Sequence, residues 1–194
     1  MEMGCFTNVF SLEKKTALVI GGGGLGAAIA TAMLENGADV IVADLKEPAE
    51  DFSAAAASLG RKYFFEQVDL LDDGSVSDMT ARAAERTGRI DILVNAAGVN
   101  VLKPAEEYDT KSWDFVLGIN LRGLHLVTRE VGKIMIRQKY GRILSISSVK
   151  SLLGTDTDYC AYCASKGAVN MYTRQLACEW GKHGITVNAI APTF

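Results

Sequence analysis

The sequence is poor in the features that mark secreted and membrane-spanning proteins. It has four cysteines in 194 residues, at positions 5, 160, 163 and 178, too few for the disulfide scaffold of a small secreted domain. No window approaches the roughly 20 apolar residues that span a bilayer, and residues 1–10 lack the positively charged segment of a signal peptide. We therefore expect a cytoplasmic protein with reduced cysteines and no membrane partner.

An excess of positive charge is also missing. The 20 lysines and arginines and the 23 aspartates and glutamates are mixed along the chain, and the net charge is −3. Proteins that bind nucleic acid or anionic lipid electrostatically carry clustered basic residues. The composition therefore argues against a nucleic-acid partner and favours a small molecule.

What is present is an alternation of short β-branched segments with helical patterns. The strand-like segments start at residues 16, 38, 61, 89, 141 and 184, and the helical patterns cover residues 25–37, 54–59, 75–85, 109–138 and 159–180. This alternation predicts parallel strands joined by crossover helices. Because the strand-like segments are almost continuously apolar, they should be buried on both faces. We predict one α/β domain over residues 1–194, a doubly wound parallel sheet with helices on both faces.

A glycine-rich turn, GGGGLG, lies between the first strand-like segment and the first helix. Gly21, Gly23 and Gly26 match the dinucleotide-binding pattern G-x-G-x-x-G. Glycines here allow a tight turn and let a pyrophosphate approach backbone N–H groups at a helix N-terminus. A structural turn without a ligand is the plainer alternative, but the position between strand and helix favours a nucleotide.

Asp44 closes the second strand-like segment, as the acidic residue of a dinucleotide-binding unit does. Its carboxylate can accept hydrogen bonds from the ribose diol of NAD and would repel the 2′-phosphate of NADP. NAD is therefore the preferred cofactor. NADP stays possible, because Lys46 is close enough in sequence to reach a phosphate.

The segment YCAYCASK, residues 159–166, holds the residues suited to proton transfer. Tyr162 and Lys166 are four residues apart and so share a helix face, whereas Tyr159 has Cys163 at that spacing. A phenol with an unperturbed pKa of about 10 is a poor base near neutral pH, and a neighbouring ammonium favours its phenolate form. Tyr162 is therefore the predicted acid/base. A core tyrosine beside a snorkelling lysine is the plainer alternative.

Three further motifs stand in order with these: Asn95-Ala96-Ala97-Gly98 after the fourth strand-like segment, Asn120 in the long helix, and Ser147-Ser148 after the fifth segment. With this combination the chain, from about Leu12 to its end, resembles the classical short-chain dehydrogenases/reductases. The resemblance implies a Rossmann-like fold, an NAD(P)-dependent oxidoreductase acting on an alcohol or ketone, and a homodimer or homotetramer.

The resemblance also implies roles for the matching residues. Ser148 is the implied catalytic serine, with Ser147 as the alternative, and Asp69 would bind the adenine amino group unless it only caps a helix. Asn120 would hold a water against Lys166. The implied catalytic set is Asn120, Ser148, Tyr162 and Lys166, with no metal. The implied cofactor-binding set is Gly21, Gly23, Gly24, Leu25, Gly26, Asp44, Leu45, Asp69, Leu70, Asn95, Ala96, Gly98, Tyr162, Lys166 and Pro192.

The sequence departs from the family pattern in three places. Ile20 stands where the family has Thr, and the glycine loop is one residue shorter. The spacing from Ser148 to Tyr162 is one residue longer than is common, which predicts a bulge between them. Thr193 replaces the usual Gly after Pro192 and the sequence ends one residue later, so the family's substrate-covering lid and last strand are expected to be missing.

Lys150, Thr155 and Asp156 lie close to Tyr162 in sequence and favour a polar secondary alcohol such as a polyol, a sugar or a sugar acid. A protein that binds NAD without turnover is one rival function, although it would not need Ser148, Tyr162 and Lys166 together.

A thiol oxidoreductase that uses the C-x-x-C formed by Cys160 and Cys163 is the other rival. Packing is the plainer role for these residues, since a free cysteine behaves as a small apolar side chain.

Overall fold

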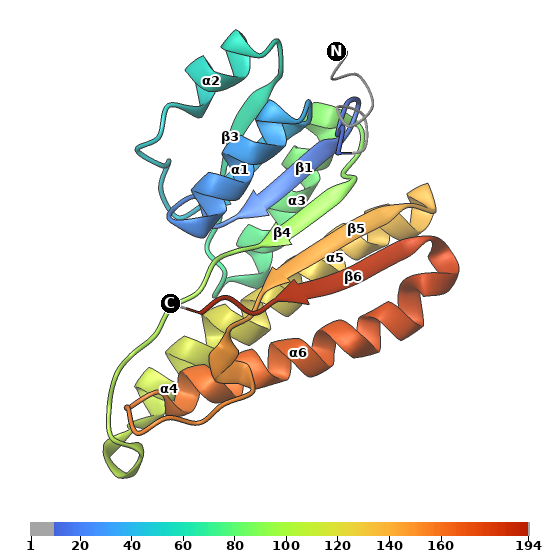
Figure 1. The fold of residues 1–194 in the computed structure, drawn as a ribbon. Coiled ribbons are helices and arrows are strands. Elements are labelled where there is room, and N and C mark those ends of the chain that lie inside the picture. The colour runs from blue at the N-terminus through green and yellow to red at the C-terminus, as the bar shows by residue number, and fades with distance from the viewer. Residues whose placement is uncertain (1–9, 194) are drawn as a thin grey trace, which may run out of the picture.

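The computed structural model describes residues 10–193 and contains a six-stranded sheet in the order β3-β2-β1-β4-β5-β6 (Figure 1). All neighbouring strands run parallel. The strands are β1 Thr16–Ile20, β2 Asp39–Asp44, β3 Tyr63–Gln67, β4 Ile92–Asn95, β5 Gly141–Ile146 and β6 Ile185–Ile190. The predicted doubly wound parallel sheet is confirmed.

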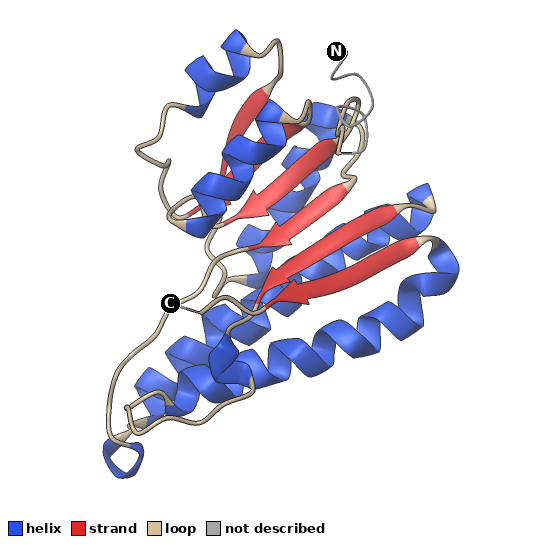
Figure 2. Ribbon diagram, viewed as in Figure 1, coloured by secondary structure: helices blue, strands red, loops and turns tan. Residues whose placement is uncertain are grey.

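Within residues 10–193, six α-helices connect the strands, and five of them cover the two faces of the sheet (Figure 2). The helices are α1 Leu25–Glu35, α2 Phe52–Ser58, α3 Asp73–Thr87, α4 Thr110–Leu117, α5 Leu124–Gln138 and α6 Cys160–Trp180, with short helical turns η1 Ala105–Glu107, η2 Gly118–Gly123, η3 Val149–Ser151 and η4 Gly181–His183. Helices α1 and α2 pack on one face, and α3, α5 and α6 pack on the other. None of the described helices is long and apolar enough to cross a bilayer.

The central strands explain why the strand-like segments are apolar throughout. Leu18 and Leu93 of β1 and β4 are buried against α3 and α5, whereas Val19 and Val94 of the same strands are buried against α1 and α2. Each such side chain contributes roughly 1.5–3 kcal/mol when fully buried. Alternate residues of one strand therefore supply two separate cores.

Two helices begin earlier than the apolar periodicity predicted. Asp51 accepts the backbone N–H of Ala54 at 2.9 Å and caps α2. Asp72 accepts that of Gly74 at 2.8 Å and caps α3. Because a capping carboxylate satisfies N–H groups that the first turn leaves free, residues 52–53 and 73–74, ahead of the predicted starts, are also helical.

The segment predicted as one helix over residues 109–138 is divided by the π-helical turn η2. Two glycines of this turn allow close packing on the neighbouring loop, since a Cβ on Gly118 would lie 2.7 Å from Leu71 Cδ2 and one on Gly123 2.8 Å from Leu70 Cβ. π-helical turns widen a helix locally and are frequent at functional sites. The turn contains Asn120.

Candidate active site

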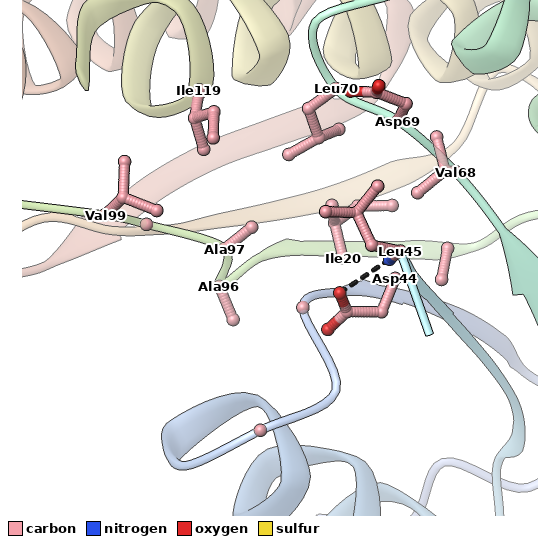
Figure 3. Close-up of a pocket in the computed structure, with 14 residues that line it drawn as sticks. Ile20, Asp44, Leu45, Val68, Asp69, Leu70, Ala96, Ala97, Val99 and Ile119 are labelled. Carbon is pink, nitrogen blue, oxygen red and sulfur yellow. Dashed lines mark hydrogen bonds between the residues drawn. The ribbon is translucent and has the colours of Figure 1, made fainter. Parts of the chain in front are cut away.

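The carboxyl ends of the strands meet at one edge of the sheet and form a cleft of about 330 Å³. Parallel sheets of this order bind ligands where successive crossovers leave in opposite directions, which here is between β1 and β4. Eight residues of the predicted cofactor set line the cleft: Gly21, Gly23, Asp44, Leu45, Asp69, Leu70, Ala96 and Gly98 (Figure 3). Ile119 of η2 also lines it and was not anticipated.

The glycine turn fits a bound pyrophosphate because side chains are excluded from it. Gly21 has a φ of +93°, and a Cβ there would lie 2.7 Å from the backbone nitrogen of Ala97. A Cβ on Gly26 would lie 1.9 Å from the carbonyl oxygen of Gly21. Gly23 has no heavy atom within 4 Å of its Cβ position and lines the cleft. The N-terminus of α1 therefore presents bare backbone to the cleft, as an anion-binding turn requires.

Asp44 ties the end of β2 to the glycine turn. Its Oδ2 accepts the N–H of Gly22 at 2.7 Å. Its Oδ1 accepts the N–H of Leu45 at 2.7 Å, the bond drawn in Figure 3. The carboxylate is thus fixed at the cleft wall. A carboxylate has about four acceptor positions, so these two bonds leave capacity for a diol.

Asp69 has the geometry of a turn residue within the cleft wall. Its Oδ1 accepts the N–H of Leu71 at 2.8 Å, and α3 takes its N-cap from Asp72 instead. The alternative that Asp69 caps a helix is therefore wrong, because Asp72 is the cap of α3. The predicted contact of Asp69 with adenine stays a prediction.

A second pocket adjoins the cleft, and the two share Gly98 and Val99. It brings together residues from the ends of β4, β5 and β6 and from the start of α6. The lining residues are Leu25, Gly98, Val99, Asn100, Ile146, Ser147, Ser148, Lys150, Tyr159, Tyr162, Pro192 and Thr193. Ser148 and Tyr162 thus face one space that opens onto the nucleotide cleft.

Lys166 lies behind Tyr162, one helical turn along α6. The Lys166 side chain is 3% exposed, and its Nζ donates a hydrogen bond to the carbonyl oxygen of Ile146 at 2.6 Å. Nζ is 5.6 Å from the centre of the Tyr162 ring. Burial lowers the pKa of Lys166 to about 8, so the ammonium form still predominates at neutral pH.

Asn120 of η2 lies close to the Lys166 ammonium, next to Gly98. Its Oδ1 accepts the N–H of Val99 at 2.8 Å, and its Nδ2 donates to the carbonyl oxygen of Val99 at 2.9 Å and to Ser165 Oγ at 3.1 Å. A Cβ on Gly98 would lie 3.5 Å from Asn120 Oδ1 and 3.4 Å from Lys166 Nζ. The two polar groups therefore converge where Gly98 leaves room.

The two neighbouring serines have different partners. Ser147 Oγ donates to the carbonyl oxygen of Lys166 at 3.3 Å, which commits its proton. Ser148 Oγ accepts the N–H of Lys150 at 3.2 Å, and a hydroxyl that accepts one bond can still donate another. This difference favours Ser148 over Ser147 as the hydroxyl that can donate to a substrate oxygen.

Several predicted residues lie outside the cleft lining. Asn95 is 3% exposed, and its Nδ2 donates to Thr128 Oγ1 of α5 at 3.1 Å. It therefore links the end of β4 to α5 and does not face the cleft. Gly24 and Gly26 line neither space, whereas Leu25 and Pro192 line the second pocket. Two groups of the site were not predicted from the sequence: Ser165, which binds Asn120, and the carbonyl group of Ile146, which binds Lys166. The role of Ile146 leaves no side-chain signal, because its backbone is the partner.

Tyr159 and the two cysteines surround Tyr162. The Tyr159 and Tyr162 rings meet edge to face, with centres 6.0 Å apart. Cys160 and Cys163 are free, half-buried thiols on α6. Residues 152–158, which contain the predicted bulge, form an exposed loop without regular secondary structure.

Comparisons with known proteins agree with this geometry. A family model described as short chain dehydrogenase matches residues 15–194. The chain is 43% identical to D-threitol dehydrogenase of Mycolicibacterium smegmatis (strain ATCC 700084 / mc(2)155) over 188 residues, which cover 95% of this chain and 71% of that protein. It is 36% identical to the NAD-dependent glycerol dehydrogenase of Listeria innocua serovar 6a over 189 residues, covering 97% of this chain and 73% of that protein.

A solved structure supports the same assignment. The gluconate 5-dehydrogenase from Burkholderia cenocepacia J2315, in complex with NADP and tartrate, matches with a TM-score of 0.86 and 30% identity, covering 96% of this chain and 73% of that chain. The chain therefore belongs to the short chain dehydrogenase family and is an oxidoreductase that depends on NAD or NADP.

Proposed function

We propose that the protein interconverts a secondary alcohol and a ketone, and that Tyr162 exchanges the hydroxyl proton. The observation that carries this proposal is the placement of Tyr162 and Ser148 in one pocket that shares Gly98 and Val99 with the nucleotide cleft. A substrate in that pocket would therefore lie next to a nucleotide bound in the cleft.

The cleft residues would each bind a different part of the cofactor. The glycine turn would hold the pyrophosphate, Asp44 the adenosine ribose, and Asp69 and Leu70 the adenine. When bound, the nicotinamide ring supplies or accepts the hydride. The carboxylate of Asp44 favours NAD over NADP, because it would repel a 2′-phosphate.

The remaining residues act on the substrate oxygen. Tyr162 takes the proton when the alcohol is oxidised and returns it when the ketone is reduced. Ser148 donates a hydrogen bond to the oxygen as its charge develops. The Lys166 ammonium lies behind Tyr162, 5.6 Å from the centre of its ring. Asn120, which converges with Lys166 on Gly98, is placed to hold the next member of a proton path.

The substrate we propose is a polyol, a sugar or a sugar acid. The pocket supports this class through its polar side chains, which include Asn100, Ser148 and Lys150. Relatives named for threitol, glycerol and gluconate support it as well. The test is an assay of purified protein with NAD and NADP against a panel of polyols, sugars and sugar acids, followed at 340 nm. Cofactor-dependent turnover of one of these classes is expected.

The rival is a protein that binds NAD without turnover. It would bind NADH, detected by fluorescence, yet turn over nothing in a broad panel of alcohols and ketones. That result would replace the proposed reaction with a regulatory or scaffold role.

We also propose that the protein forms a homodimer or homotetramer through α4 and α6. Phe115 of α4 is 41% exposed and Met171 of α6 is 60% exposed, and both are large apolar side chains of the kind that subunit interfaces cover. Light scattering after size-exclusion chromatography is expected to give two or four times the monomer mass of 20.8 kDa.

A further inference from the structure

We propose that the substrate is a sugar acid rather than a neutral polyol, and that Lys150 binds its carboxylate. This inference rests on the proposed function and narrows its substrate class. It assigns the role of a specificity-determining residue to a lysine outside the predicted catalytic set.

The charge of the substrate pocket points to an anion. Lys150 is the one charged side chain among the described residues that line it. The other polar lining side chains are Asn100, Ser147, Ser148, Tyr159, Tyr162 and Thr193, all neutral hydroxyl or amide groups. A wall with one cation and several hydrogen-bonding groups suits a polyhydroxylated acid.

Lys150 is held in place on this wall. Its Nζ donates to Thr155 Oγ1 at 2.8 Å and lies 4.5 Å from the centre of the Tyr159 ring. Its backbone N–H donates to Ser148 Oγ at 3.2 Å. The ammonium is thus fixed relative to the serine and beside the ring that contacts Tyr162. A positioned cation loses less conformational entropy on binding than a free lysine does.

The ammonium also has unused binding capacity. An ammonium has three donors, and Thr155 takes one of them. Among the described residues, the ion pairs within 4.0 Å do not include Lys150. The nearby acidic residues Asp156 and Asp158 are exposed and do not line the pocket. A substrate carboxylate would therefore be the counter-ion of Lys150.

Matched substrates that differ only at the charged group test this inference. Gluconate and sorbitol, threonate and threitol, and glycerate and glycerol each share a hydroxyl pattern and differ by a carboxylate in place of a hydroxymethyl group. The wild-type kcat/KM is expected to be about ten-fold or more higher for the acid of any pair that is turned over, since one charge-assisted hydrogen bond is worth a factor of this order.

Variants then locate the preference. Lys150→Met is expected to lower the ratio of acid to polyol kcat/KM by about 10- to 100-fold, through KM more than kcat, and Lys150→Arg to retain most of the ratio. Lys182→Met, at an exposed site on η4, is the control and should leave the ratio unchanged. A wild type that prefers the polyols, or a ratio equal in Lys150→Met and wild type, would overturn the inference while the alcohol–ketone reaction stands.

A binding measurement decides the inference without turnover. Quenching of the fluorescence of protein-bound NADH by gluconate should saturate at lower concentration than quenching by sorbitol, and added salt should weaken only the gluconate effect. Lys150→Met should abolish this salt-sensitive difference. If no substrate is turned over but the difference is present, the proposed reaction fails and the carboxylate site stands. If the difference is absent, the carboxylate site fails.

Discussion

Asn120 and Val99 are joined by two hydrogen bonds that run in opposite directions. The side-chain amide of Asn120 accepts from the N–H of Val99 at 2.8 Å and donates to its carbonyl group at 2.9 Å. The bonds link the π-helical turn η2 to the loop after β4, which borders both the nucleotide cleft and the substrate pocket. The widened turn and the pocket wall are therefore one structural unit.

Asn120→Asp should break this unit while keeping the size of the side chain. A carboxylate can still accept from Val99 N–H but cannot donate to the Val99 carbonyl group or to Ser165. Because the site is 1% exposed, we expect the free energy of unfolding to fall by about 2–4 kcal/mol, with a loss of turnover. Asn188→Asp at an exposed position of β6 is the matched control and should change stability by less than about 0.5 kcal/mol. If urea denaturation showed the same loss of stability for Asn120→Asp and Asn188→Asp, Asn120 would not have this structural role.

The glycine turn separates a folding role from a binding role. Gly26→Ala places a Cβ 1.9 Å from the Gly21 carbonyl oxygen, so we expect stability to fall by more than about 2 kcal/mol. Gly23→Ala has open space around its Cβ and should fold normally, yet it should weaken NADH binding by about ten-fold, because a pyrophosphate needs that space. Thermal unfolding and NADH fluorescence titration measure the two effects. A destabilised Gly23→Ala, or one with undiminished NADH affinity, would show that the turn does not work this way.

Asp44 should set the choice of cofactor. We expect the wild type to bind NADH more tightly than NADPH, and Asp44→Asn to reduce that ratio by about ten-fold or more, since it removes the charge that repels a 2′-phosphate. Fluorescence titration with both nucleotides gives the ratio directly. Glu35→Gln, at an exposed site on α1, controls for the general loss of one negative charge. An unchanged ratio in Asp44→Asn would remove Asp44 from cofactor selection.

The burial of Lys166 predicts a pH dependence of stability. The pKa of Lys166 is about 8 in the folded protein, below the 10.5 of an unperturbed lysine, because burial disfavours the charge. Between these values the unfolded chain binds more protons, so this group's contribution to the free energy of unfolding rises with pH. The destabilising contribution is complete below pH 8 and fades toward pH 10.5.

Lys166→Met lacks this contribution. The stability of the wild type minus that of Lys166→Met should therefore rise by about 2 kcal/mol between about pH 7.5 and pH 9.5. Urea denaturation at the two pH values measures the difference. A difference that stays constant with pH would mean that Lys166 titrates normally in the folded state.

Much of the fold could be predicted because its signals are local. The strand-like segments are apolar throughout, and the glycine turn and Asp44 mark successive strand ends. The division of the long helix could not be predicted, since no local pattern marks the π-helical turn, whose Gly118 and Gly123 pack on a loop distant in sequence. The early starts of α2 and α3 depend on caps that apolar periodicity does not register.

The site could be predicted where chemistry resides in side chains, and less well where it depends on strand register. Asn95 ends β4 and was expected at the cleft. Its neighbour Val94 packs on the α1 face, so alternation turns Asn95 to the opposite face, toward Thr128 of α5. The carbonyl group of Ile146 holds Lys166 and could not be found from residue types, because any residue has a carbonyl group there.

The central claim is that the Tyr162 hydroxyl carries the proton in the reaction. Tyr162→Phe removes one oxygen and leaves the ring in place. We expect kcat to fall by about 10²- to 10⁴-fold while the affinity for NADH, measured by fluorescence, stays within a factor of about two. Tyr140→Phe serves as the control, because the Tyr140 ring lies beside Lys15 and Arg142 at the opposite end of β5. Full turnover by the Tyr162→Phe protein with its natural cofactor would contradict the account.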